Sequence, residues 1–439
     1  MGYRYNFKKN KFEKTGLLFL KTKQSDININ INDELYKNKV KKYSFIPKFI
    51  SSKIEYTNEL KISLLPGEYD LKIYKESYWD WKKMIEIKPN LTTFATEIKL
   101  FKKTLPIKII DGNNSKIMGS PKQNTETIYM TNSNKATSSL MSYIIDSKKI
   151  NTIHAFLESS KNNFNLSPKG SKILISENNS NYIINTDKEK EQIYLNDIGK
   201  NLVNIKWDMD NDYILYGIGK NNHIIYKIDL IKQKKEPLAM AKCDDYIIQK
   251  NKLYIIENNE KNKTTILKLS INEENVDIAI FPYTENLNFI ENTGEFLMLK
   301  DSNASVTYII DPLAPFLNKI KATINGIQKY RWNDEKNKLL YMNDFEIWIY
   351  DLNENKNRLI TRLSDKIKNV IWHKNENFII FNTSSSINIL ETSNEGNKNQ
   401  IELLSTKNID SILIDKKGET LYFNGEIGVQ TGLFSLDLY

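Results

Sequence analysis

Residues 167–175 read SPKGSKILI, a polar turn rich in Pro, Gly and Lys that is followed directly by an apolar triplet. The same pattern returns along the rest of the chain. Eight apolar triplets, spaced 39–45 residues apart, begin at Ile128, Ile173, Ile214, Leu253, Leu297, Leu339, Ile379 and Leu421. A period near 42 residues indicates a repeat protein in which each repeat packs against its neighbours.

Two further signatures accompany each triplet. Seven residues before its start lies a large, mostly apolar anchor that ends a preceding strand: Pro121, Leu166, Trp207, Tyr246, Ile290, Trp332, Trp372 or Ile414. After the triplet comes a strand that ends in Asp, as in IIYKIDL at 224–230, YIIDP at 308–312, IWIYDL at 347–352 and LFSLDL at 433–438. With a fourth strand such as RLITRL at 358–363, each repeat matches a four-stranded propeller blade. We expect Trp207, Trp332 and Trp372 to pack between neighbouring blades.

The number of repeats predicts an eight-bladed ring over residues 105–439. The last repeat has only three strands, and LPIKII at 105–110 precedes the first repeat as an orphan strand. Pairing this strand with 433–438 would close the ring and remove its exposed edges. Three alternatives stay open: seven blades closed by residues 150–156, a β-solenoid, or a pair of β-sandwiches. The polar turn and the YDL strand resemble the blades of TolB-like and WD40-like bacterial propellers, a resemblance that implies protein or ligand binding more often than catalysis.

Residues 15–104 lack this repeat and read as a separate small domain. TGLLFLKT at 15–22, DINININD at 26–33 and LLPGEYDLKIYKESYWDW at 64–81 are expected to form successive strands with a Pro-Gly turn. This region resembles a PEGA domain, a small β-sandwich of bacterial envelope proteins, through its first strand, its Asn-rich hairpin and the residues Pro66, Gly67, Tyr69, Leu71, Ile73 and Tyr78. It departs from that family by a polar insertion at 41–59. The expected fold class is therefore all-β, a PEGA-type sandwich followed by a propeller.

A PEGA domain followed by a propeller resembles membrane-anchored surface proteins of small-genome bacteria. The resemblance implies a cell-envelope ectodomain whose basic segment 1–14 directly follows a transmembrane helix that this chain does not contain. The longest apolar runs, such as LLFL at 17–20, are far shorter than the roughly 18 residues that a membrane-spanning helix needs. An intracellular location stays open, because Arg4, Lys8, Lys9 and Lys11 beside a membrane would favour the cytoplasmic face.

The positive charge of the chain is confined to its N-terminal quarter. Residues 1–104 contain 22 Lys and Arg against 12 Asp and Glu, a net charge of +10, whereas the whole chain has a net charge of +9. This asymmetry predicts that residues 1–104 face an anionic membrane or wall polymer. The alternative is that the lysines reflect only biased codon usage. Nucleic acid is disfavoured, because the basic residues are dispersed over strands and arginines are few.

Candidate chemistry is sparse. The single cysteine, Cys243, and the three histidines, His154, His223 and His373, lack the spacing of metal ligands, and no GxSxG nucleophile motif occurs. The acidic stretch DMDND at 208–212 lacks the glycine and the terminal Glu of an EF-hand and fits an ordinary turn between strands. We therefore assign no catalytic residue, metal or cofactor.

Trp79 and Trp81 are the candidate partner-binding residues, because a spacing of two places them on one face of a strand. Packing in a core is the alternative for both. The favoured function is a non-catalytic envelope scaffold whose propeller binds a protein or glycan. A propeller enzyme acting on glycans in the central channel and an intracellular scaffold are the other hypotheses. Carboxylates converging in the channel would favour the enzyme. Neither the ligand nor the oligomeric state follows from the sequence.

Overall fold

In the computed structural model the regular structure of the described residues is almost entirely β-strand, as the sequence predicts. The structure describes residues 2–7, 10–22, 24–36, 58–112, 117–119, 126–133, 137–157, 162–177, 180–186, 192–199, 201–240, 243–271, 274–292, 295–393 and 398–439. Within these ranges the helical elements are α1 (Leu195–Ile198) and the 3-10 turn η1 (Phe316–Asn318). Neither described helix is long and apolar enough to cross a bilayer.

The N-terminal part begins with a hairpin and continues as two small sheets. The hairpin pairs β1 (Tyr3–Asn6) with β2 (Lys11–Lys14). One sheet has the strand order β6 (Asn58–Leu64), β3 (Gly16–Thr22) and β9 (Thr92–Ile98). The other has the order β5 (Glu34–Leu35), β4 (Asn28–Ile31), β7 (Gly67–Tyr74) and β8 (Trp81–Ile87).

Alternation of buried and more exposed side chains along β3 and β8 packs the two sheets face to face. Leu18 and Leu71, one from each sheet, are fully buried in the shared apolar cluster. The result is a small sandwich in which β3, β4 and β7 lie within the segments expected at 15–22, 26–33 and 64–81. Its other strands β6, β8 and β9 lie mostly outside those segments. The polar insertion at 41–59 lies outside the described residues, apart from its last two positions in β6.

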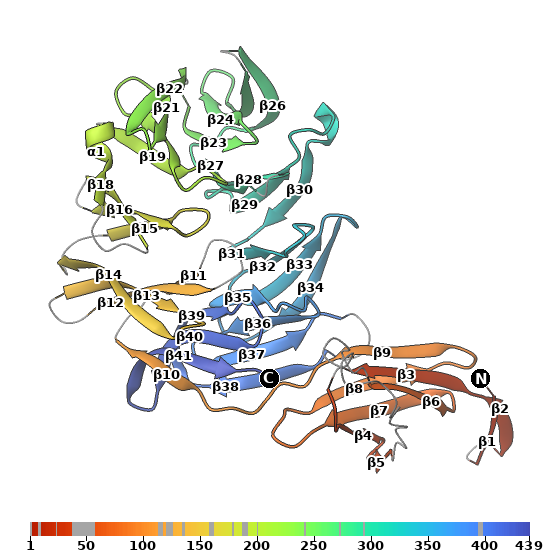
Figure 1. Cartoon of the computed structure of the whole chain (residues 1–439). Coiled ribbons are helices and arrows are strands. Elements are labelled where there is room, and N and C mark those ends of the chain that lie inside the picture. The colour runs from red at the N-terminus through yellow and green to blue at the C-terminus, as the bar shows by residue number, and fades with distance from the viewer. Residues whose placement is uncertain are drawn as a thin grey trace, which may run out of the picture.

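Eight four-stranded antiparallel sheets follow, and each is one blade of a ring within the described residues (Figure 1). The strands of the first four blades are β11 (Ile117–Gly119), β12 (Thr127–Ser133), β13 (Thr137–Ile144) and β14 (Lys149–Leu157); β15 (Asn162–Leu166), β16 (Lys172–Glu177), β17 (Ser180–Asn185) and β18 (Gln192–Tyr194); β19 (Leu202–Trp207), β20 (Ile214–Gly219), β21 (Ile224–Asp229) and β22 (Lys234–Met240); β23 (Asp245–Gln249), β24 (Lys252–Asn259), β25 (Thr264–Ile271) and β26 (Glu274–Pro282).

The strands of the next three blades are β27 (Leu287–Asn292), β28 (Leu297–Asp301), β29 (Val306–Ile310) and β30 (Ile320–Asn325); β31 (Lys329–Trp332), β32 (Lys338–Met342), β33 (Glu346–Asp351) and β34 (Lys356–Arg362); β35 (Asn369–Trp372), β36 (Phe378–Asn382), β37 (Ser386–Glu391) and β38 (Gln400–Ser405). The eighth blade combines β39 (Lys407–Ile414), β40 (Thr420–Ile427) and β41 (Gln430–Asp437) with β10 (Ile107–Asp111) from the start of the ring.

The ring closes as the sequence predicts. β10 pairs antiparallel with β41, with Ile107 opposite Ser435 and Ile110 opposite Leu433. Residues 150–156, the closing strand of the seven-bladed alternative, instead belong to β14 and pair with β13. Eight apolar clusters each join two consecutive blades, and one of them joins the eighth blade to the first.

The predicted triplets all lie in the second strand of a blade. These strands are covered on both faces by neighbouring blades, so that every residue of β20 and β36 is buried. A strand buried on both faces needs a continuous apolar run, which explains why this position gives the clearest repeat signal.

The predicted tryptophan anchors also pack between blades. Trp332 and Trp372 are 2% and 6% exposed, and Trp207 is half-buried against the cluster between the second and third blades. Pro121, the anchor predicted for the first repeat, lies outside the described residues.

The Asp that recurs after the third strand in several blades has a local structural role. Asp229 Oδ1 accepts hydrogen bonds from the backbone N–H groups of Ile231 and Lys232, and Asp351 does the same in its own turn. An Asp that caps the turn in this way fixes the connection to the outermost strand.

Candidate functional site

The candidate site is the junction between the N-terminal sheets and the seventh and eighth blades. The connecting residue Phe101 is fully buried and belongs to the apolar cluster that joins these two blades. Its ring lies 5.2 Å from the ring of Phe378 and 5.5 Å from that of Tyr439, between centroids. The backbone N–H of Trp79 donates to Phe101 O at 2.7 Å, and that of Lys102 donates to Leu438 O at 2.9 Å. These contacts pack the sandwich directly onto the ring.

His373 lies at the centre of this junction and is 1% exposed. Its Nδ1 accepts a hydrogen bond from the Asn375 backbone N–H at 3.0 Å, and its Nε2 lies 3.0 Å from Gly418 O and 2.9 Å from Tyr439 Oη. Burial, with a smaller effect of the Lys99 charge, lowers the pKa of His373 to about 4. The imidazole is therefore neutral at physiological pH.

A buried ion pair forms a second link between the modules. Lys83 Nζ, on β8, donates to Glu391 Oε1 of the seventh blade at 3.1 Å and to Ser393 Oγ at 2.8 Å. The two charged side chains are only 8% and 10% exposed. The other carboxylate oxygen, Glu391 Oε2, is buried without a hydrogen-bond partner among the described residues.

A groove of about 770 Å³ opens beside this ion pair. One wall consists of residues 83–86 of β8 and 91–97 around β9, and the other consists of Asn377, Glu391 and Ser393 of the seventh blade. The side chains of Leu91 and Phe94 are 56% and 57% exposed there.

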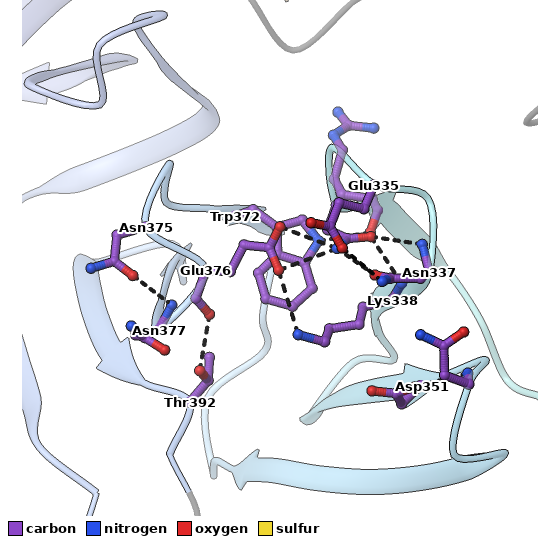
Figure 2. Close-up of polar contacts among 12 residues, drawn as sticks. Glu335, Asn337, Lys338, Asp351, Trp372, Asn375, Glu376, Asn377 and Thr392 are labelled. Atoms are coloured by element: carbon purple, nitrogen blue, oxygen red, sulfur yellow. Dashed lines mark hydrogen bonds and ion pairs between the residues drawn. The ribbon is translucent and has the colours of Figure 1, made fainter. Parts of the chain in front are cut away.

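A polar network braces the blade wall of this groove (Figure 2). Thr392, which lies between the groove residues Glu391 and Ser393, donates through Oγ1 to Glu376 O at 3.0 Å. The Glu376 carboxylate accepts from Asn333 Nδ2 of the sixth blade at 3.1 and 3.2 Å and pairs with Lys338 Nζ at 3.6 Å. Asn333 is 1% exposed, whereas the Lys338 and Glu376 side chains are 39% and 32% exposed. The connection links the turn of the seventh blade to the sixth.

Trp79 and Trp81 do not form the shared aromatic surface that their spacing suggests. Trp81 is 2% exposed and packs in the core of the sandwich, whereas Trp79 precedes β8 and packs partly against the cluster of the seventh and eighth blades. A partner-binding patch made by both side chains is therefore wrong as a prediction. Trp81 is a core residue, and Trp79 belongs to the junction.

The acidic stretch at 208–212 forms a turn between the first and second strands of the third blade, as expected. Asp208 Oδ1 accepts from the backbone N–H groups of Asp210 and Asn211, and Asp212 accepts from those of Lys169 and Ser171 in the second blade. Asp212 therefore ties two adjacent blades together.

Cysteine and histidine occupy separate environments. Burial, with the nearby charges of Asp245 and Asp244, raises the pKa of the Cys243 thiol to about 12, so little thiolate forms at neutral pH. His154 Nε2 lies 3.0 Å from Tyr182 Oη, and His223 is exposed in a turn. Among the described residues, no group of three or more His, Cys, Asp or Glu is placed to hold a metal ion.

Among the described residues, the most buried carboxylate in the first strands of the blades is that of Asp245, which is 3% exposed. Its Oδ1 accepts from Asn204 Nδ2 and Lys206 Nζ, each at 2.6 Å, and its Oδ2 accepts from the Phe289 N–H at 2.8 Å. These partners lie on the third and fifth blades, so that Asp245 joins three consecutive blades. Its oxygens are already used by the protein.

Comparison with known proteins is informative about the fold. No family model and no curated protein matches the chain. A chain from a crystal structure of the eukaryotic initiation factor has a TM-score of 0.50 at 11% identity, over 82% of this chain and 95% of that chain. The fold is a β-propeller.

Two other solved structures are similar at lower TM-scores. A chain of the mitotic checkpoint complex has a TM-score of 0.40 at 12% identity, over 79% of this chain and 99% of that chain. An oligogalacturonate lyase in complex with manganese has a TM-score of 0.43 at 10% identity, over 74% of this chain and 98% of that chain.

Proposed function

We propose that this protein is a non-catalytic binding scaffold of the cell envelope. In this proposal the propeller, with the sandwich packed against it, recognises a protein or glycan partner, while the basic PEGA-like N-terminal module lies against an anionic membrane or wall polymer. The observation that carries the proposal is the combination of exposed aromatic and basic side chains on the β1–β2 hairpin.

The hairpin carries exposed aromatic and basic side chains, a combination that suits a membrane interface. Tyr3, Phe7 and Phe12 are 67%, 87% and 71% exposed, and Lys11 and Lys14 are exposed on the same hairpin. Exposed aromatic rings are costly in water but suit the boundary between headgroups and acyl chains, and neighbouring cations attract anionic lipids. This arrangement supports a surface-binding role more strongly than the dispersed charge alone.

The hydrogen bonds of Asp245 fit a binding scaffold better than a catalytic site. Asp245 accepts hydrogen bonds from Asn204, Lys206 and Phe289, and these bonds link its blade to the two neighbouring blades. A glycan-cleaving enzyme would need a pair of carboxyl groups at a separation suited to acid and base or nucleophile chemistry. A carboxylate committed to three blades is poorly suited to either task.

Cosedimentation of the full chain with liposomes tests this proposal. We expect binding to vesicles that contain phosphatidylglycerol, and none to phosphatidylcholine alone. Binding should weaken as the ionic strength rises from about 0.01 M to 0.15 M, because the Debye length falls from about 30 Å to 8 Å. The double variant Phe7→Ser/Phe12→Ser should lose about tenfold in affinity, since the aromatic anchors are removed.

Leu105→Ser is the matched control, because Leu105 is 87% exposed but lies outside the hairpin. It should bind vesicles as the wild type does. Salt-independent binding, or equal binding by the hairpin variant, would contradict the proposal and favour codon bias as the origin of the charge asymmetry.

A further inference from the structure

The groove between the sandwich and the seventh blade exposes two strand edges that pair with no further strand among the described residues. Within those residues β8 is the last strand of its sheet and pairs with β7, β9 is the last strand of the other sheet and pairs with β3, and Thr93 Oγ1 donates to Glu86 O at 2.8 Å between the two edges. Consecutive residues of both strands line the groove, at 83–86 and 92–97. A strand edge whose consecutive residues line a groove presents its backbone N–H and C=O groups there, as well as its side chains.

Between Thr92 and Ala95 the edge of β9 lacks the devices that usually shield such strands, and a register irregularity lies beyond Ala95. Leu91 and Phe94 are more than half exposed there, and Met84 of β8, in the same wall of the groove, is 41% exposed. Lysines, prolines and bulges commonly prevent pairing at a free edge. The β9 register with β3 is regular from Thr92 to Ala95, and its irregularity comes only beyond that point. This segment is open to an added strand.

The polar groups of the groove indicate the charge of its occupant. Lys83 is paired with Glu391, and Lys88 lies 3.3 Å from Glu86. Two further carboxylates, Glu68 and Glu97, also line the groove and give it a negative excess. Glu391 Oε2, buried and without a hydrogen-bond partner among the described residues, adds an acceptor at the blade wall.

We propose that this groove binds an extended segment of a partner protein in which apolar and basic residues alternate. The segment pairs as an additional strand with the edge of β9, its apolar side chains pack on Leu91, Phe94 and Met84, and its basic side chains approach Glu68 and Glu97. Strand addition of this kind takes affinity from main-chain hydrogen bonds and specificity from alternate side chains. The inference rests on the proposed binding role and places one partner at the junction.

Fluorescence anisotropy with a labelled (Val-Lys)4 peptide tests the proposal on the full chain. The wild type should bind this peptide and should bind its fully N-methylated form at least about tenfold more weakly, because the methylated backbone cannot donate to the strand edge. Phe94→Ser should also weaken binding by about tenfold. Amide hydrogen exchange at 92–95 should slow when the peptide is bound.

Phe12→Ser is the matched control, because it removes an exposed Phe from the hairpin instead of the groove. It should bind the peptide as the wild type does but bind anionic vesicles more weakly, whereas Phe94→Ser should bind vesicles normally. Failure of the groove proposal and failure of the membrane proposal are thereby distinguishable. No peptide binding at about 1 mM, equal binding of the N-methylated peptide or of Phe94→Ser, or protection confined to other strands would overturn the inference.

Discussion

Single tryptophans hold adjacent blades together through both apolar packing and one hydrogen bond. Trp372 is 6% exposed, and its Nε1 donates to Arg331 O of the preceding blade at 3.0 Å. Trp207 makes the equivalent bond to Asn165 O at 3.1 Å. This bond satisfies the indole N–H at two of the three tryptophan anchors, whereas Trp332 Nε1 donates to Met298 Sδ at 3.3 Å.

Trp372→Ala should therefore lower the free energy of unfolding by about 3–5 kcal/mol, the cost of truncating a buried aromatic side chain. Phe345→Ala, at a position that is 47% exposed, is the control and should cost less than about 1 kcal/mol. Reversible urea unfolding measures both. A similar small loss for the two variants would mean that Trp372 does not contribute to the packing between blades.

His373 should make stability depend on pH in the acid range. Its pKa is about 4 in the folded chain against about 6.5 when unfolded, so between these values the unfolded state binds more protons. The contribution of His373 to the free energy of unfolding is thus fully present above pH 6.5. It falls as the pH drops towards 4, by up to about 3 kcal/mol. The Lys99 charge also opposes protonation of the imidazole.

Urea midpoints measured from pH 7 to pH 4 test this expectation. The carboxylates of the chain also titrate in this range, so His373→Gln supplies the comparison. The difference in stability between the wild type and His373→Gln should shrink as the pH falls. A difference that stays constant from pH 7 to pH 4 would show that His373 does not titrate as described.

At the scale of elements, ring closure depends on a close approach between β10 and β41. Gly432 has φ of 150°, and a Cβ placed there would lie 2.0 Å from Ile110 O. Gly432→Ala should therefore destabilise the ring by about 2–3 kcal/mol through steric overlap and backbone strain. Amide exchange in β10 should also accelerate.

Gly428→Ala is the control for this substitution, because Gly428 also has positive φ, of 62°, but nothing lies within 4 Å of its added Cβ. It should cost only about 1 kcal/mol, the strain of the left-handed backbone. Unchanged exchange in β10 of Gly432→Ala would contradict the closure described here.

The repeated strands could be predicted from the sequence, but the junction could not. Triplets such as that at Ile379 are visible because a strand covered on both faces needs consecutive apolar residues. Lys83 and Glu391 are 308 positions apart and belong to no shared period, so nothing in the local pattern of either residue indicates their ion pair. The packing of Phe101 could not be predicted either, because an apolar residue in a connecting segment does not indicate which apolar cluster it belongs to.

At the scale of the whole molecule, the sandwich packs against the ring through Phe101 and the Lys83–Glu391 ion pair. Lys83→Met measures how much this packing depends on charge, because it leaves the buried Glu391 carboxylate without its cation. We expect a loss of about 3–5 kcal/mol in unfolding free energy, largely recovered in the double variant Lys83→Met/Glu391→Leu. Equal losses in the single and double variants would assign the effect to packing alone.

Pulsed electron paramagnetic resonance most directly tests the central claim that the two modules form one binding unit. Spin labels would replace Leu35 on β5 and Val429 in the turn after β40, which are 50% and 98% exposed, in a chain carrying Cys243→Ala. The packed junction predicts a single narrow distance distribution between the labels, broadened in Lys83→Met. A broad distribution in the otherwise wild-type chain would contradict the account, because the sandwich would then be tethered to the propeller without packing against it.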